Sequence, residues 1–290
     1  MSLQWRHNTT VVNGINIHYV SHGTGAPLLM LHGWPEFWFA WRKQIPVISE
    51  HYQVIVPDLR GFGYSDKPFE GYDTKTSAAD MFQLTQSLGF QKVSIVAHDI
   101  GARVAFRYVL DNESSVDRVV LLDSTPPIEQ LGNQPPAVIR ERWHSYFHQQ
   151  FDLPEKLIEG REEIYLRHIF RDWCINKYVL SDEEITEYVK AYSQPGALRG
   201  GFNYYRAAAY QDPDDWRAEA ERVLTHPLLF LYGDRRVRTA QEMGVASLDD
   251  SWKKFFPNVI GRHMGNYGHF LQWETPDAVN RAILEFLDSD

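Results

Sequence analysis

The chain has 290 residues, of which 43% are hydrophobic and 23% are charged, and its net charge is −9. That length and apolar content suffice for one large domain, or for a core with an inserted segment. The acidic excess disfavours nucleic acid and anionic membrane surfaces as partners, because both are negatively charged.

Cysteine content and hydropathy narrow the class of protein further. Cys174 is the only cysteine, so no intramolecular disulfide can form. The first ten residues, MSLQWRHNTT, lack the apolar stretch of a signal peptide. No apolar run approaches the about 18 residues of a membrane span. We therefore expect a cytoplasmic protein.

Short apolar runs alternate with helical patterns along most of the chain. Residues 11–20 contain Asn13-Gly14, a turn signal that predicts a hairpin. Further strands are predicted at 26–31, 52–57, 93–97, 119–122, 227–232 and near Val259, and helices at 76–88, 101–110 and 278–287. This alternation predicts an α/β fold, with a parallel sheet covered by helices on both faces.

Residues 126–223 break this rhythm, because they are aromatic-rich and helical without a convincing buried strand. We expect them to form a helical cap inserted between two parts of one core, residues 1–125 and 224–290. Polar residues that directly follow the apolar runs include His32, Asp58, Asp99 and Asp123. Ligands bind beyond the carboxyl ends of such strands, so these residues are candidates for the site.

Asp99 stands in the most informative motif, VSIVAHDIGAR, a strand followed by a tight turn and a helix. Ala97 and Gly101 flank it at the small positions of the G-x-S-x-G nucleophile elbow of α/β-hydrolases. A carboxylate in the serine position attacks a saturated carbon and forms an alkyl-enzyme ester, which water then hydrolyses. The substrate is then an epoxide or a halogenated carbon rather than an ester. The alternative is that Asp99 only caps the following helix.

The remaining candidates follow the order along the chain that this fold requires, which is nucleophile, acid and then histidine. The backbone amides of Trp34 and Ile100 are the expected oxyanion donors. His269, before the last helix, is the expected base for water, with His263 as the fallback. The acid that orients His269 is expected at Asp123, with Asp234 as the alternative. The usual position after the seventh strand holds Arg236.

Three segments resemble the epoxide hydrolase and dehalogenase branch of the α/β-hydrolases: HGWPEFWFAW (32–41), DLRGFGYS (58–65) and HDIGAR (98–103). The resemblance extends over essentially the whole chain. It implies a mostly parallel eight-stranded sheet, a helical cap over the active site, and chemistry that needs no metal or organic cofactor.

Two segments of the expected cap, WHSYF (143–147) and FNYYRA (202–207), are similar to those of the Cif-like subgroup of epoxide hydrolases. That subgroup opens the epoxide ring with a histidine and a tyrosine, which implies His144 and Tyr205 here. Tyr204 could exchange roles with Tyr205, and we expect Tyr204 and Trp34 to line the substrate pocket. The competing interpretation is that His144 and Tyr205 only pack the cap.

Haloacetate dehalogenases are the closest competitor. They carry one arginine directly after the nucleophile, a second three residues later, and a tryptophan after the cap histidine. This chain has Ile100, Arg103 and Ser145 at those positions. In that subgroup the two arginines together hold the substrate carboxylate. Replacing the first of them by Ile100 removes one arm of this charge-assisted clamp, which costs roughly 2–3 kcal/mol.

The resemblance therefore favours an epoxide hydrolase, with haloacetate dehalogenase as the alternative. A non-catalytic binding protein on a hydrolase fold is the alternative from another class. The expected partners are a small epoxide and water, not nucleic acid or a membrane, with a homodimer as the assembly to be tested.

Overall fold

The computed structural model describes residues 5–131, 134–245 and 247–289. Their strands form one eight-stranded sheet in the order β1-β2-β4-β3-β5-β6-β7-β8. The strands are β1 His7–Val12, β2 Ile15–His22, β3 Pro27–Leu31, β4 Gln53–Pro57, β5 Val93–His98, β6 Val116–Leu122, β7 Leu228–Tyr232 and β8 Ile260–His263. β2 runs antiparallel to both of its neighbours, and every other pair is parallel. The predicted mostly parallel α/β sheet is confirmed.

The predicted N-terminal hairpin is also confirmed. Asn13 and Gly14 join β1 to β2 with φ values of 47° and 78°. Two successive positive φ angles are what a two-residue hairpin turn requires, and Asn-Gly adopts them at little cost.

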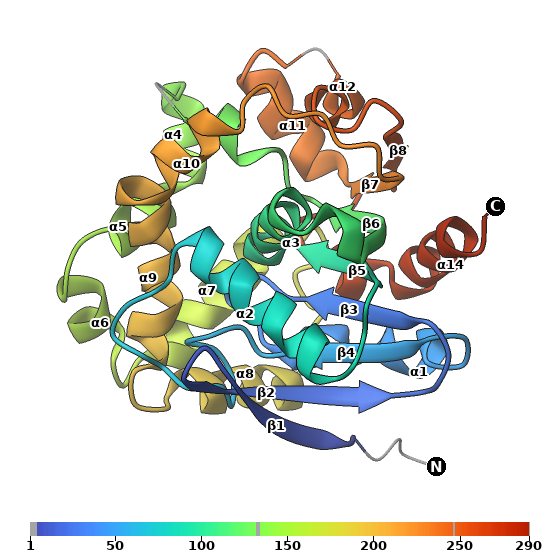
Figure 1. Ribbon diagram of the computed structural model, residues 1–290. Helices are drawn as coiled ribbons and strands as arrows, with labels where there is room; N and C mark the ends of the chain where they lie inside the picture. The colour runs from blue at the N-terminus through green and yellow to red at the C-terminus, as the bar shows by residue number, and fades with distance from the viewer. Residues whose placement is uncertain (1–4, 132–133, 246, 290) are drawn as a thin grey trace.

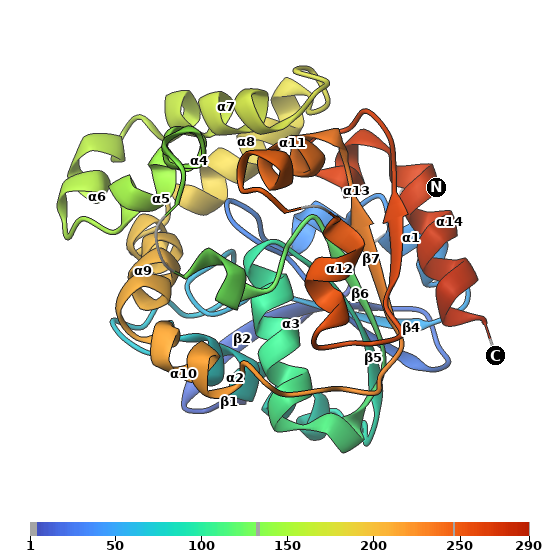
Figure 2. The ribbon, with the colours of Figure 1, turned by 90° about the horizontal axis from the view of Figure 1, so that it is seen from above.

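Helices cover both faces of the sheet (Figure 2). α2, α3 and α12 lie on one face, and α1 and α14 lie on the other. The core helices are α1 Ile45–Ile48, α2 Thr74–Ser87, α3 Ile100–Asp111, α11 Asp234–Glu242, α12 Leu248–Lys253, α13 Leu271–Glu274 and α14 Pro276–Leu287, with short 3₁₀ turns η1 Trp38–Trp41 and η2 Glu113–Ser115. α2 begins two residues earlier than predicted, because Asp73 accepts a hydrogen bond of 2.8 Å from the amide of Thr76 and caps the helix.

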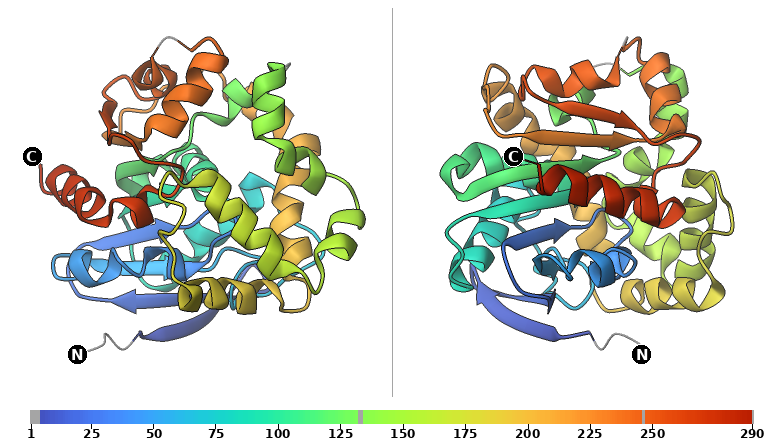
Figure 3. Two further views of the ribbon diagram at one scale, coloured as in Figure 1. Left: turned by 180° about the vertical axis from the view of Figure 1, so that it is seen from behind. Right: turned by 90° about the vertical axis from the view of Figure 1, so that its right-hand side faces the viewer.

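The described residues between β6 and β7 form helices and no strand. They are η3 Pro127–Gln130, α4 Pro136–Glu141, α5 Trp143–His148, α6 Leu153–Ile158, α7 Glu162–Trp173, α8 Asp182–Tyr192, α9 Ala197–Tyr210 and α10 Asp212–Ala218. We call this part of the chain the helical insertion. It gathers at the edge of the sheet toward which the parallel strands point (Figures 1 and 3). Side chains at the carboxyl ends of the strands therefore face the helical insertion.

None of the helices within the described ranges is both long and apolar enough to cross a membrane.

Candidate active site

The turn between β5 and α3 places Asp99 at the edge of the sheet that faces the helical insertion. Asp99 has φ 52° and ψ −119°, a strained conformation for a residue with a side chain. A Cβ atom on Gly101 would lie 2.4 Å from the carbonyl oxygen of His32, and one on Gly33 would lie 2.3 Å from Cβ of Asp99. The small residues around this turn are thus required because the loop after β3 passes directly against it.

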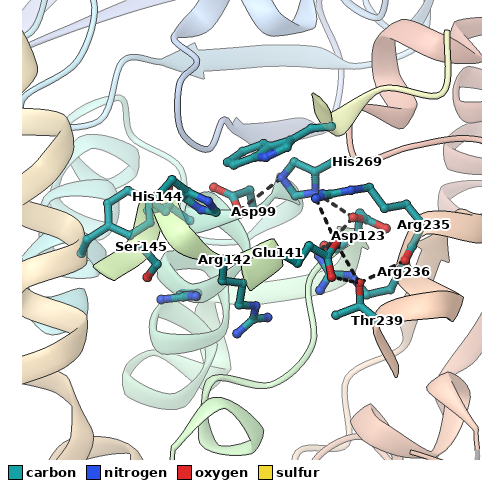
Figure 4. A pocket seen from close by; sticks show the side chains of 14 residues that line it. Asp99, Asp123, Glu141, Arg142, His144, Ser145, Arg235, Arg236, Thr239 and His269 are labelled. Atoms are coloured by element: carbon teal, nitrogen blue, oxygen red, sulfur yellow. Dashed lines mark hydrogen bonds and ion pairs between the residues drawn. The ribbon is translucent and has the colours of Figure 1, made fainter. Parts of the chain in front are cut away.

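Asp99, His269 and Asp123 follow one another in space (Figure 4). Nε2 of His269 lies 3.4 Å from Oδ2 of Asp99, and its Nδ1 lies 2.7 Å from Oδ2 of Asp123. Asp234 instead pairs with His263 at 2.7 Å in a partly exposed position. Of the two acids and two histidines considered from the sequence, the structure thus brings Asp123 and His269 to Asp99.

Arg236 explains why an acid is missing after β7. Its guanidinium donates hydrogen bonds to the backbone carbonyl and to Oδ2 of Asp123, the latter at 3.1 Å. Burial alone would raise the pKa of Asp123, but the charge of Arg236 and the hydrogen bond with His269 lower it below its usual value. Asp123 therefore remains an anion that can orient His269.

The carboxylate of Asp99 is also held as an anion. The amide of Trp34 donates a hydrogen bond of 3.0 Å to Oδ1. Burial would raise the pKa of Asp99, but His269, His98 and the Trp34 amide lower it well below its usual range. An ionised carboxylate beside a histidine can act as a nucleophile toward carbon.

Ile100 and Trp34 take different places relative to the cavity in front of Asp99. Ile100 is the first residue of α3 and lines the cavity. The ring of Trp34 is fully buried and is not part of the cavity wall, which differs from the expectation that it lines the pocket. The Trp34 ring lies parallel to the His144 ring, with the centroids 6.0 Å apart, and so packs behind a residue of the cavity wall. The backbone amide of Trp34 donates its hydrogen bond to Asp99.

His144 on α5 and Tyr205 on α9 line the same cavity as Asp99. Their rings are nearly perpendicular, with centroids 5.7 Å apart. Burial lowers the pKa of His144 to about 3, although the charge of Asp99 acts in the opposite direction. Burial and the nearby Asp99 raise the pKa of Tyr205 well above its usual value. At neutral pH both groups are uncharged, and both can donate a hydrogen bond into the cavity.

Tyr204 points away from this cavity, which corrects its expected place in the substrate pocket. Its hydroxyl donates to the carbonyl of Arg60 at 3.1 Å and lies 3.4 Å from the hydroxyl of Ser77. Consecutive residues on a helix are about 100° apart, so α9 can direct only one of the two tyrosines toward Asp99. The spacing of the motif could not show which one.

His32 and Asp58 also follow strands, but they hold loops and do not line the cavity. Nε2 of His32 accepts a hydrogen bond of 3.0 Å from the amide of Leu59. Asp58 is buried and accepts from the amides of Trp38 and Tyr64, at 2.6 and 2.9 Å. Their position at the edge of the sheet is therefore structural.

A buried network behind the site has no counterpart in the sequence-based prediction. Glu36 accepts hydrogen bonds from the amide of Gly33 at 2.8 Å, from Nδ1 of His98 at 2.7 Å and from Gln272 at 2.6 Å. Nε2 of His98 lies 2.9 Å from the carbonyl oxygen of His269. The amide nitrogen of Gln272 lies farther from Nδ1 of His98, at 3.2 Å. The two nearest partners of His98, the Glu36 carboxylate and the His269 carbonyl, accept, which favours a ring with a proton on each nitrogen. Burial would lower the pKa of His98, but Glu36 raises it.

This network connects the loop that holds Trp34, the residue before Asp99 and the backbone of His269. The only signal in the sequence is that Glu36 lies within the segment 32–41 and His98 within the segment 98–103, and their 62-residue separation does not predict a pair.

Four arginines line the cavity, and only two of them, Arg103 and Arg236, were considered from the sequence. The other two are Arg142 and Arg235. The remaining wall residues are Asp99, Ile100, Asp123, Glu141, His144, Ser145, Trp173, Tyr205, Thr239 and His269. Arg235 forms an ion pair of 2.9 Å with Glu141. In the described part of the chain, no group of three or more His, Cys, Asp or Glu side chains is placed to hold a metal ion.

Comparison with known proteins gives matches along the whole chain. A family model described as alpha/beta hydrolase fold matches residues 26–276. The soluble epoxide hydrolase of Corynebacterium sp. (strain C12) is 35% identical over 290 residues, covering 99% of this chain and 98% of that protein. A fluoroacetate dehalogenase of Burkholderia sp. is 30% identical and covers 95% of this chain and 91% of its own length. The structure of the epoxide hydrolase CorEH without ligand superposes with a TM-score of 0.90 at 34% identity, covering 98% of this chain and 99% of that one.

Proposed function

This chain belongs to the α/β-hydrolase fold family, and we propose that it is an epoxide hydrolase that forms a vicinal diol through a covalent ester on Asp99. One observation supports this most directly. Asp99, His269 and Asp123 line a cavity whose wall also contains two neutral hydrogen-bond donors from the helical insertion, His144 and Tyr205. The similarity to a soluble epoxide hydrolase over the full chain agrees with it.

In the first half of the reaction, Oδ2 of Asp99 attacks a ring carbon of the epoxide. Oδ1 is the atom held by the Trp34 amide, so it remains as the carbonyl oxygen of the new ester. The electron pair of the broken carbon–oxygen bond passes to the ring oxygen, which takes the hydroxyl proton of Tyr205 and leaves a phenolate, while the neutral His144 ring donates a hydrogen bond to the same oxygen. An alkoxide is a poor leaving group, so Tyr205 and His144 lower this barrier.

In the second half, water hydrolyses the ester. His269 takes a proton from the water, whose oxygen bonds to the ester carbon of Asp99, and Asp123 stabilises the resulting imidazolium. The amides of Trp34 and Ile100 stabilise the charge that develops on Oδ1. The ester bond to the substrate then breaks, and the departing oxygen takes the proton from the His269 imidazolium. The proton left on the Asp99 carboxyl returns through water to the Tyr205 phenolate, so the diol leaves and the carboxylate of Asp99 is restored.

The helical insertion has the role of a cap domain in this proposal, with residues 126–223 inserted between core parts 1–125 and 224–290. It supplies the two ring-opening donors, while the core supplies the nucleophile and the base. Closing the site between two layers also keeps bulk water away from the ester until His269 activates one molecule.

The test is diol formation from styrene oxide and cyclohexene oxide, with Asp99→Asn as the inactive variant. Asp234→Asn is the matched control, because it neutralises a partly exposed acid outside the cavity. In His269→Gln, the mass of the protein should increase by the mass of one substrate. Absence of diol from wild type with both epoxides, or absence of the adduct, would contradict the proposal, and a binding protein would give neither.

Haloacetate dehalogenation is the second candidate, favoured by the relative from Burkholderia and by the arginines in the cavity wall. Against it, Ile100 and Ser145 both line the cavity, at the positions where that subgroup carries arginine and tryptophan. Halide release from chloroacetate, followed with an ion electrode, distinguishes the two. Release of halide without any diol from epoxides would reverse the ranking.

A further inference from the structure

Two successive glycines allow α9 to approach the core closely. A Cβ atom on Gly200 would lie 2.6 Å from the carbonyl oxygen of Gly61, in the loop after β4, and one on Gly201 would lie 3.0 Å from both Cδ1 and Nε1 of Trp34. A side chain at either position would therefore push α9 away from the core. Alanine is more favourable than glycine inside a helix, so helix propensity does not account for this pair, whereas the close approach does.

The Trp34 ring against which Gly201 packs is held in place by its surroundings. It is fully buried, and its centroid lies 4.6 Å from that of the His148 ring and 5.6 Å from that of the Trp173 ring. The backbone amide of the same residue donates the hydrogen bond to Oδ1 of Asp99. The ring is therefore fixed relative to the nucleophile, and an element that rests on the ring takes its position from the nucleophile turn.

Gly201 and Tyr205 are one helical turn apart, so they lie on the same face of α9. The Tyr205 ring contacts the Trp34 indole as well, nearly perpendicular to it at 87° with the centroids 5.6 Å apart. Helix α9 thus rests on one indole at two points, through the backbone of Gly201 and through the ring of Tyr205. These two contacts set how deeply α9 sits, and with it how far the Tyr205 hydroxyl is from Asp99.

We propose that the indole of Trp34, packed against Gly201, positions Tyr205 relative to Asp99 for the opening of the epoxide ring. This inference rests on the proposed epoxide hydrolase function. Tyr205 must reach the ring oxygen while Oδ2 of Asp99 reaches the ring carbon, so the rate of ester formation depends on the distance between the two groups. Hydrolysis of the ester uses His269 and Asp123, neither of which lies on α9, so the contact should matter for the first half of the reaction only.

The test is Gly201→Ala with styrene oxide as substrate. The added methyl group would meet the indole at 3.0 Å, whereas carbon atoms pack best at about 3.5–4.0 Å, so α9 must move outward by a few tenths of an ångström. A displacement of about 1 Å can cost about 10²-fold in rate, so ester formation should slow roughly 3- to 10-fold. Ester formation is followed as adduct mass in the His269→Gln background. Diol release by the protein that keeps His269 reports ester hydrolysis, which should stay within about twofold of wild type.

A double-mutant cycle shows whether Gly201 acts through Tyr205. In the Tyr205→Phe background the hydroxyl is already absent, so Gly201→Ala should slow ester formation by less than about twofold. A purely structural role would give the same factor in both backgrounds. Trp34→Phe tests the contact from the other side, because it removes Nε1 and the second ring but keeps the backbone amide, and it should also slow ester formation selectively. Alanine favours a helix, so Gly201→Ala is expected to fold, and Trp34→Phe gives the same measurement if it does not.

The matched control is Gly261→Ala on β8, where a Cβ atom would also meet a side chain, that of Asp249, but outside the cavity. Both steps should stay within about twofold of wild type in this control. Unchanged ester formation in Gly201→Ala, equal slowing of both steps, or the full loss in the Tyr205→Phe background would overturn the positioning role and leave the hydrolase function standing. No adduct in His269→Gln with Gly201 and Tyr205 intact would instead overturn the proposed function, and this inference with it.

Discussion

Asp123→Asn should separate the two halves of the proposed reaction. Asp123 is fully buried, and its Oδ2 lies 2.7 Å from Nδ1 of His269. The charges of a carboxylate and an imidazolium are delocalised, so their centres are about 4 Å apart in such a pair, and at an effective dielectric constant of about 20 they attract by about 4 kcal/mol. The imidazolium forms only when water attacks the ester, so hydrolysis should slow about 10³-fold while formation of the ester on Asp99 is largely preserved.

The assay is rapid mixing of enzyme with excess styrene oxide, followed by intact-mass spectrometry and diol analysis. Asp123→Asn should give a rapid rise of one alkyl adduct per active site and then very slow diol release. Because Arg236 loses its charged partner, the variant should also be less stable. The amount of adduct formed in the rapid phase measures how much of the protein is folded. Asp234→Asn should behave as wild type. Slow ester formation with normal ester hydrolysis, or unchanged turnover, would refute the role of Asp123.

Three further predictions concern the cap donors and the buried network. The pKa of His144 is about 3 in the folded protein and about 6.5 in the unfolded chain, so its contribution to stability is complete above pH 6.5 and is lost as the pH falls toward 3. Between pH 7 and pH 5 the wild-type protein should therefore lose about 2 kcal/mol of its free energy of unfolding through this group. His144→Gln should not show this part of the loss in urea unfolding. Tyr205→Phe should lower kcat for epoxides roughly 10²- to 10⁴-fold. Tyr204→Phe removes a hydroxyl that donates to the backbone, so it should lower the free energy of unfolding by about 1 kcal/mol and leave kcat within a few-fold of wild type. Similar kcat values for the two variants would contradict the assignment of Tyr205 as the donor. Glu36→Gln should leave the charge of His98 without its anion, reducing the free energy of unfolding by about 3–5 kcal/mol in chemical denaturation, and an unchanged midpoint would argue that His98 is neutral.

The sequence predicts the architecture well because most strands of the core carry their own local signal, and only β8 is weakly marked. β3, β5 and β7 are short apolar runs that end in turn or polar residues, and the alternation with helices leaves a parallel sheet as the simplest arrangement. The elbow at Asp99 is equally local, since it needs only small residues on either side of one acid.

Features that depend on the approach of distant segments could not be predicted in this way. Tyr204 and Tyr205 are adjacent in sequence, and only the packing of α9 against the core decides which hydroxyl reaches the cavity. The contact of Glu36 with His98 and the position of Arg142 beside Arg103 likewise depend on loops whose paths no periodicity describes.

The position of the orienting acid follows from the geometry of two neighbouring strands. β6 and β7 are parallel, Leu122 pairs with Leu231, and the amide of Asp123 donates to the carbonyl of Leu231 at 2.8 Å. The ends of the two strands thus lie side by side beneath His269, and an acid from either end can approach the same ring nitrogen. Once the acid stands at Asp123, a second carboxylate after β7 would repel it at short range, whereas Arg236 at that position attracts it. The arginine in place of the usual acid is therefore part of the same arrangement, and Arg236→Asp should raise the pKa of Asp123 and slow ester hydrolysis rather than restore a second orienting acid.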